Sequence, residues 1–223
     1  MLFHDKSKKA GWIKELAGCW RELLFWMLLL PAFGALGSIH PRRQLVGLIE
    51  TCAFLAVAIS STGKLKSLGL EFASWNRIGR GAAVACVLAG LLAGGMIVAV
   101  ASISRQPLGT ENGWNNAVLA IALGPVLEEL IFRGYLLTAA LLLTRRLSQP
   151  SSAASSIVGV AVVFAIAHLT TTGTTVIQLC SIVLTGCLYG YIRLGYRSTV
   201  AAAVAHGVYN LALYLSYWSG ISR

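Results

Sequence analysis

The stretch GPVLEELIFRGY, residues 124–135, places Glu128, Glu129 and Arg133 inside an otherwise apolar part of the chain. The surrounding window, residues 114–144, exceeds the length of about 20 apolar residues that a helix needs to cross a bilayer. An ionisable side chain at the centre of a bilayer costs about 2.5–3.5 kcal/mol on insertion scales, so membrane helices usually retain such residues for a function. The stretch therefore predicts a transmembrane helix whose ionisable residues have a function.

The composition of the whole chain also indicates a membrane protein. Of its 223 residues, 57% are hydrophobic and only 12% are charged, whereas a soluble domain carries about 25% charged residues. The recurring apolar windows predict an all-α, polytopic protein with about seven transmembrane helices. These predicted helices cover residues 23–39, 45–62, 81–104, 114–144, 156–170, 174–194 and 199–217.

The basic residues indicate how the chain is oriented. The sequence has 18 Lys and Arg against 8 Asp and Glu, a formal net charge of +10. Because cytoplasmic loops are rich in Lys and Arg, we expect a cell-membrane protein with its N-terminus in the cytoplasm and its C-terminus outside. Anionic headgroups of the lipid bilayer account for the basic loops, so no nucleic-acid partner is expected. A secretory signal sequence is the alternative interpretation of the N-terminal segment.

Helical spacing separates the two adjacent glutamates. Glu129 and Arg133 are four residues apart and share a face, so they are expected to form an ion pair. Glu128 points about 100° away from Glu129 and stays available as a general base. The alternative is a purely structural ion pair with a spare glutamate.

Two later windows carry polar residues at a similar depth. Counted at about 1.5 Å per residue from the polar ends of their windows, Glu128, His168 and Asn210 lie at roughly 25, 18 and 20 Å. Three helices are therefore expected to present these side chains to one buried locus. His206 and Asn210 are four residues apart and can both donate hydrogen bonds toward one point, as the stabilisation of an oxyanion requires.

The motifs on these three helices resemble those of the CPBP family, the CAAX type II proteases and bacteriocin-processing enzymes that are also called Abi-type membrane proteins. The resemblance covers somewhat under half of the chain. It rests on three motifs in order: Glu128-Glu129-x-x-x-Arg133, Phe164-x-x-x-His168 and His206-x-x-x-Asn210.

The resemblance implies a membrane endopeptidase whose site residues can be assigned one by one. The residues that match the family's water-activating pair are Glu128 and His168, and those that match its oxyanion stabilisers are His206 and Asn210. Glu129 is also counted in the active site, with Arg133 as its structural partner. Substrates compatible with the family include prenylated CAAX tails, leader peptides, pheromone precursors and other membrane-associated peptides or proteins.

The resemblance also implies a division of the chain. Residues 114–219 would form the CPBP-like protease core. Residues 1–113 would contribute an N-terminal cytoplasmic segment and three accessory helices, and residues 220–223 a short tail.

Three alternatives stay open. A zinc ion bound by Glu128, His168 and His206 would make the protein a metalloendopeptidase, although the sequence lacks the H-E-x-x-H motif and a mechanism without a cofactor is favoured. A non-catalytic immunity or scaffold protein would use the same helices to bind a peptide partner. A proton-coupled transporter would use the buried ionisable groups as a relay.

Overall fold

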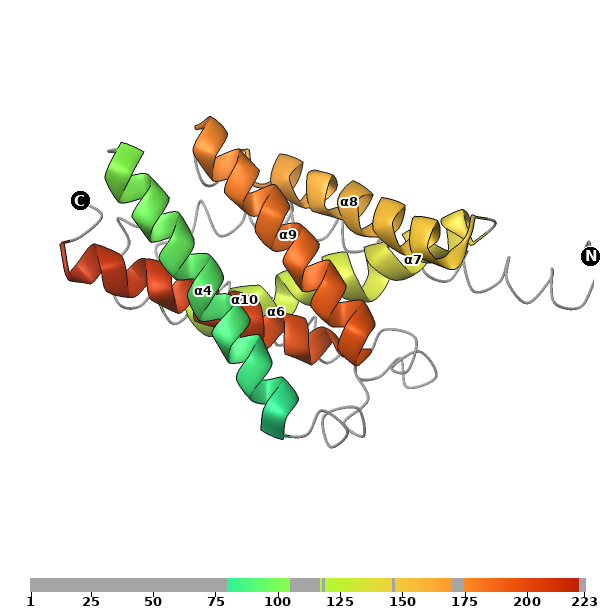
Figure 1. Ribbon diagram of the computed structural model, residues 1–223, viewed down its shortest axis with the longest axis horizontal. Coiled ribbons are helices and arrows are strands. Elements are labelled where there is room, and N and C mark those ends of the chain that lie inside the picture. The colour runs from blue at the N-terminus through green and yellow to red at the C-terminus, as the bar shows by residue number, and fades with distance from the viewer. Residues whose placement is uncertain (1–79, 105–116, 118, 146, 170–174, 221–223) are drawn as a thin grey trace, which may run out of the picture.

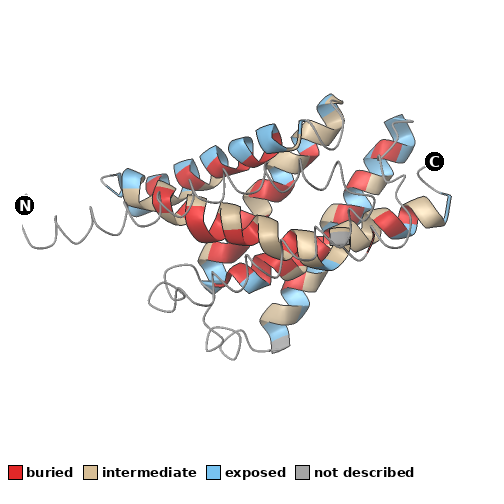
Figure 2. Cartoon of the chain, turned by 180° about the vertical axis from the view of Figure 1, so that it is seen from behind, coloured by how far each residue is buried: buried red, intermediate tan, exposed pale blue. Residues whose placement is uncertain are grey.

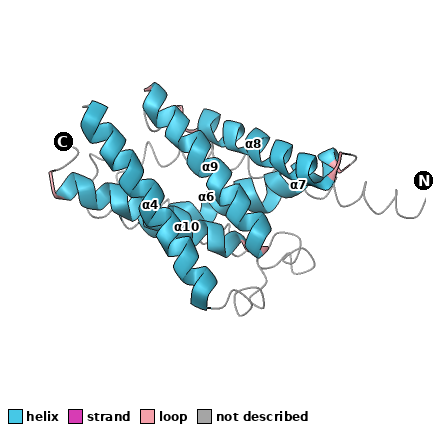
Figure 3. Cartoon of the chain, viewed as in Figure 1, coloured by secondary structure: helices cyan, strands magenta, loops and turns pink. Residues whose placement is uncertain are grey.

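All regular structure in the described part of the chain is helical, and it contains no strand (Figure 3). The predicted helices at 23–39 and 45–62 lie outside the described residues. The all-α class predicted from the sequence is confirmed. The computed structural model describes residues 80–104, 117, 119–145, 147–169 and 175–220.

Four of the described helices are long and apolar enough to cross a membrane: Gly81–Ser104, Gln149–Ala167, Val176–Tyr196 and Thr199–Trp218. They agree in place with four of the predicted spans. In chain order the elements are α4 (Arg80–Ser104), η2 (Leu119–Leu123), α6 (Gly124–Glu129), η3 (Leu130–Leu136), α7 (Leu137–Thr144), α8 (Gln149–Ala167), α9 (Val176–Tyr196) and α10 (Thr199–Trp218), where η2 and η3 are π-helices.

The predicted helix at 114–144 runs without a break from η2 to α7, because the junctions between its segments keep right-handed helical dihedral angles. Pro125 lies buried in the first turn of α6. Proline has no N–H, so the carbonyl of Ile121, four residues earlier, receives no α-helical hydrogen bond from it. This part of the helix packs closely against α10, since a Cβ atom added to Gly207 would lie 2.5 Å from Ile121 O.

The predicted start of α8 was wrong. The helix begins at Gln149, whereas the sequence placed its start at Ser156. Ser148 at the N-cap and Pro150 in the first turn are typical of a helix start. With the corrected start, His168 lies 19 residues from the beginning of α8, about 28 Å at 1.5 Å per residue, which matches the depth of about 25 Å expected for Glu128 more closely.

Glycines four residues apart allow two pairs of helices to pack closely. A Cβ atom at Gly94 of α4 would lie 2.7 Å from Ala212 Cβ of α10. On α9, a Cβ atom at Gly186 would lie 3.0 Å from Ala161 Cβ of α8. Figure 1 shows α4 crossing α10 and α9 lying beside α8. Small residues at such spacing are typical of helix pairs in membranes.

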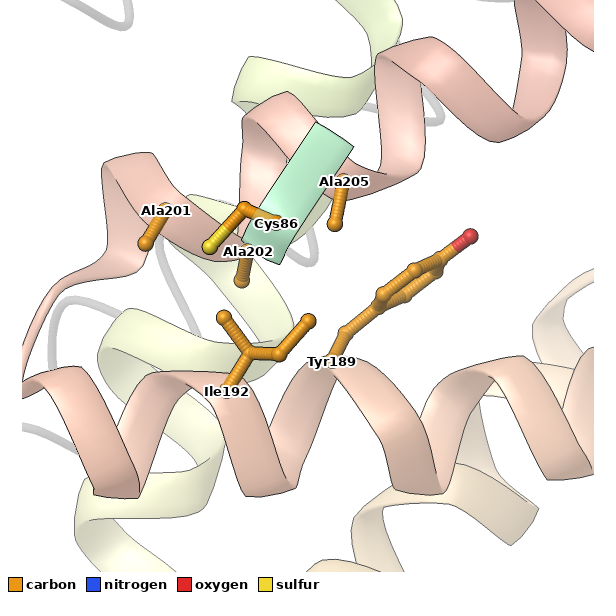
Figure 4. Close-up of a cluster of buried hydrophobic side chains, with 6 residues drawn as sticks. All are labelled: Cys86, Tyr189, Ile192, Ala201, Ala202 and Ala205. Carbon is orange, nitrogen blue, oxygen red and sulfur yellow. The ribbon is translucent and has the colours of Figure 1, made fainter. Parts of the chain in front are cut away.

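A buried apolar cluster joins α4, α9 and α10 (Figure 4): Cys86, Tyr189, Ile192, Ala201, Ala202 and Ala205. Along each long helix, buried residues alternate with exposed ones, so one side of the helix faces its neighbours (Figure 2). Large apolar side chains cover the outer side of α4, where Leu92 is 73% exposed and Ile103 84% exposed. This distribution fits a protein whose outer surface contacts lipid.

We expect Gly90→Ala to destabilise the α4–α10 contact, because the new Cβ atom would clash with Ala205 O and lie 2.9 Å from Val208 Cβ. Overpacking of this kind costs about 1–3 kcal/mol. Gly95→Ala is the matched control on the same helix, since nothing lies within 4 Å of its added Cβ atom. Thermal unfolding in detergent should show a lower Tm for Gly90→Ala only; equal Tm values would contradict this packing.

Candidate active site

Arg133 is fully buried at the centre of the described helices. Its Nη1 donates a hydrogen bond to Glu129 Oε1 at 3.0 Å, and its Nη2 donates to the carbonyl oxygen of Gly186 at 3.1 Å. Its Cζ lies 4.3 Å from the ring centroid of Phe164, within reach of a cation–π interaction. The predicted ion pair between Glu129 and Arg133 is therefore present, and the arginine also contacts α8 and α9.

Glu129 holds a second group besides Arg133. Its Oε1 lies 3.0 Å from Nδ1 of His206, and the Glu129 side chain is 0% exposed. A carboxylate accepts hydrogen bonds, so Nδ1 of His206 is the donor. This bond joins the helix of motif one to α10 and leaves Nε2 as the free nitrogen of the His206 ring.

Glu128 points elsewhere, as the helical spacing predicts. Its Oε2 lies 3.5 Å from Nε2 of His168 and 3.8 Å from Nε2 of His206. The Oε2 atom is buried, while the Glu128 side chain as a whole is 35% exposed. One carboxylate oxygen thus faces two imidazole nitrogens at the edge of the packed interior.

His168 is the C-cap residue of α8, at the helix end and not within the helix as the sequence predicted. Its Nδ1 lies 2.8 Å from the carbonyl oxygen of Phe164, which can only accept a hydrogen bond. The ring of Phe164 also packs edge-on against His168, with centroids 4.4 Å apart. These two contacts direct Nε2 of His168 toward Glu128.

Asn210 lies one helical turn beyond His206 on α10. Its Nδ2 donates a hydrogen bond to the carbonyl oxygen of Ala120 in η2, at 2.7 Å. An amide nitrogen carries two hydrogens, so this bond uses one and leaves the second. The structure therefore brings Glu128, His168 and His206 together directly, and it ties Asn210 to the π-helix that precedes Glu128.

Helix α9 also contributes to the candidate site, which its sequence does not indicate. Gly186 supplies the carbonyl that accepts from Arg133, and Tyr189 stacks on His206 with ring centroids 4.8 Å apart and planes 18° apart. Neither residue belongs to a motif, and both look like packing residues of an apolar helix. The four-residue spacing of Gly186 and Gly190 is typical of a close helix contact, but it does not indicate that an arginine lies at that contact.

Glu128, His168 and His206 are the side chains that a bound zinc ion would use. Within the part of the chain that the structure describes, no group of three or more His, Cys, Asp or Glu side chains is arranged to hold a metal ion. The approach of two Nε2 atoms to one carboxylate oxygen therefore does not by itself make a metal site.

Comparison with known proteins identifies one family. Residues 110–212 match the family model described as type II CAAX prenyl endopeptidase, Rce1-like. The matched segment contains all three motifs and confirms the resemblance seen in the sequence. No curated protein and no solved structure matches the chain.

We expect Arg133→Met to lower the stability of the protein severely, by about 3–5 kcal/mol, because it leaves the charge of Glu129 buried without its partner. The double variant Glu129→Leu/Arg133→Met removes both charges and should recover much of this loss. Unfolding in detergent micelles, followed by circular dichroism, measures both. A double variant no more stable than Arg133→Met would show that the unpaired charge is not the cause.

Proposed function

We propose that the protein is an intramembrane endopeptidase whose water nucleophile is activated by Glu128, because residues 110–212 match the family model of the Rce1-like type II CAAX prenyl endopeptidases. One observation carries the proposal most directly. A buried oxygen of Glu128 faces Nε2 of His168 at 3.5 Å and Nε2 of His206 at 3.8 Å. These distances exceed those of good direct hydrogen bonds, so Glu128 Oε2 keeps its capacity to accept a hydrogen bond from the water nucleophile, with the two imidazole nitrogens beside it.

Glu128 and His168 act on the water. The carboxylate of Glu128 takes a proton from the water as its oxygen attacks the carbonyl carbon of the scissile peptide bond. His168 is held by the Phe164 carbonyl with Nε2 toward Glu128, so the two side chains can share that proton. The proton then passes to the amine nitrogen as the C–N bond breaks, and the products are an amine and a carboxylic acid, which loses its proton to become a carboxylate.

His206 and Asn210 stabilise the oxyanion that forms on the carbonyl oxygen. A protonated His206 ring donates from Nδ1 to Glu129 and from Nε2 to the oxyanion. Asn210 adds its second amide hydrogen, while the first stays on Ala120 O. Donors fixed in advance in a water-poor site are the usual source of the largest electrostatic stabilisation in acyl-transfer enzymes.

Glu129 orients His206, and Arg133 compensates the charge of Glu129. A carboxylate hydrogen-bonded to Nδ1 fixes the ring orientation and stabilises the imidazolium form, which donates from both ring nitrogens. Arg133 is anchored at the same time on Glu129 and on the Gly186 carbonyl. The adjacent glutamates thus divide the work between proton transfer and orientation.

The proposed substrate is a membrane-associated peptide or protein, and a prenylated CAAX tail is the first candidate because of the family. Such a tail would be cut after the lipidated cysteine, with release of the last three residues. Leader peptides and other membrane-proximal peptides are the next candidates.

We further propose that the chain lies in the cell membrane with a cytoplasmic N-terminus and an external C-terminus, because this orientation places most of its Lys and Arg residues on the cytoplasmic side.

Glu128→Gln should abolish cleavage, with a loss of about 10²–10⁴-fold, because the amide cannot accept the proton from water. The change keeps the size of a side chain that is 35% exposed, so the fold should be retained. Mass spectrometry of membrane-proximal peptides from cells with the wild type or Glu128→Gln measures the effect. The control is Glu71→Gln, which changes a glutamate outside the three motifs and outside residues 110–212.

Only Glu128→Gln should lose the cleavage products. Identical peptide profiles in all three cultures would argue against proteolysis. Retained biological activity of Glu128→Gln with altered peptide profiles would instead indicate a scaffold or immunity role, and substrate-gradient uptake without cleavage would indicate a transporter.

Cleavage by the purified protein should survive exhaustive chelation, because the proposed steps use only side chains and water. The measurement compares initial rates before and after dialysis against a strong chelator, together with the metal content of the protein. A loss of activity that stoichiometric zinc restores would contradict the glutamate mechanism and favour a zinc site at Glu128, His168 and His206.

A further inference from the structure

Helix α9 carries none of the three motifs, yet two of its residues contact the candidate site. The Gly186 carbonyl accepts a hydrogen bond from Arg133, and the ring of Tyr189 stacks on His206. The close contact of Gly186 with Ala161 and of Gly190 with Ile157 holds this helix against α8. The backbone of α9 therefore places the Tyr189 ring at a fixed position beside the site.

Tyr189 lies between the apolar core and the charged groups. It is 1% exposed and belongs to the buried cluster of α4, α9 and α10. Figure 4 shows its ring extending from α9 and pointing away from Ile192. Its ring lies 18° from the plane of His206 at a centroid distance of 4.8 Å. The ring centroid is also 5.4 Å from Cζ of Arg133.

The hydrogen bond to Glu129 does not by itself fix the His206 ring. It holds Nδ1 3.0 Å from Glu129 Oε1, but rotation about the Cβ–Cγ bond can still tilt the ring plane. Such a tilt moves Nε2, the atom that lies 3.8 Å from Glu128 Oε2. A nearly parallel aromatic ring against the imidazole face restricts that tilt, because stacked rings have a preferred separation and offset.

We propose that Tyr189 is a positioning residue that sets the plane of His206 and so directs Nε2 toward the reacting carbonyl. The inference rests on the proposed function, because it assumes that His206 acts on the oxyanion. Tyr189 touches neither substrate nor water in this role. Its aromatic ring, and not its hydroxyl group, carries the effect.

The test compares Tyr189→Met with Tyr189→Phe in the peptide-cleavage assay. Methionine fills an apolar space but lacks a planar ring, so kcat should fall about tenfold or more while KM stays within twofold, since misplacement of a reacting group affects the chemical step. Tyr189→Phe keeps the ring and should retain kcat within about twofold. The control Tyr191→Met lies on the same helix and is 72% exposed, so it should behave as the wild type.

Each result bears on the proposal. An unchanged kcat in folded Tyr189→Met, or a rise in KM alone, would overturn it. If Tyr189→Met does not fold, Tyr189→Phe decides: retained kcat supports the role of the ring, and a tenfold loss contradicts it. Wild-type protein that cleaves while Glu128→Gln does not shows that the proposed function holds whatever Tyr189 does; a wild type without activity removes the function and this inference together.

Discussion

The fully buried pair of Arg133 and Glu129 is the constraint on which the described helices depend. Arg133 reaches α9 through the Gly186 carbonyl and α8 through the ring of Phe164, and Glu129 reaches α10 through His206. A buried charge that loses its partner is strongly destabilising, so an arrangement of these helices that separates Arg133 from Glu129 is disfavoured. The arrangement that keeps the two side chains paired also places Glu128 beside His168 and His206.

The pair also gives the two adjacent glutamates different surroundings. Glu129 is committed to Arg133 and His206, both at 3.0 Å, and cannot take part in proton transfer without loosening them. Glu128 projects to a different side of the helix, where one of its oxygens is buried against the two histidines and the rest of the side chain is partly exposed. The buried contacts of Glu129 thus support the neighbouring Glu128, whose side chain is partly exposed.

Much of this arrangement could be predicted from residue spacing, which reports faces of a helix well. The ion pair, the separate direction of Glu128 and the close approach of helices at Gly94 and Gly186 all follow from intervals of one or four residues. The start of α8 was misplaced because its serine-rich first turns look like a loop. In the structure, hydroxyl groups of these turns bond to Thr144, with Ser152 Oγ at 2.8 Å and Ser156 Oγ at 2.9 Å.

The remaining features depend on tertiary contacts. The π-helical turns at η2 and η3 span five and seven residues, too few for apolar periodicity to distinguish them from α-helix. Tyr189 and the Ala120 carbonyl have no sequence signal of their own, because their roles come from α9 and α10 lying beside the motif helices. Two of the seven predicted helices, at 23–39 and 45–62, stay predictions.

The most direct measurement of direct water attack follows oxygen from water into the product. Purified protein in lipid vesicles is incubated with a prenylated CAAX peptide in water enriched in oxygen-18, and the products and the protein are weighed by mass spectrometry. Attack by water that Glu128 activates predicts one heavy oxygen in the new C-terminal carboxylate and no covalent adduct on the protein at any time. An acylated protein during turnover would contradict direct attack, and an intact peptide throughout would contradict peptide hydrolysis.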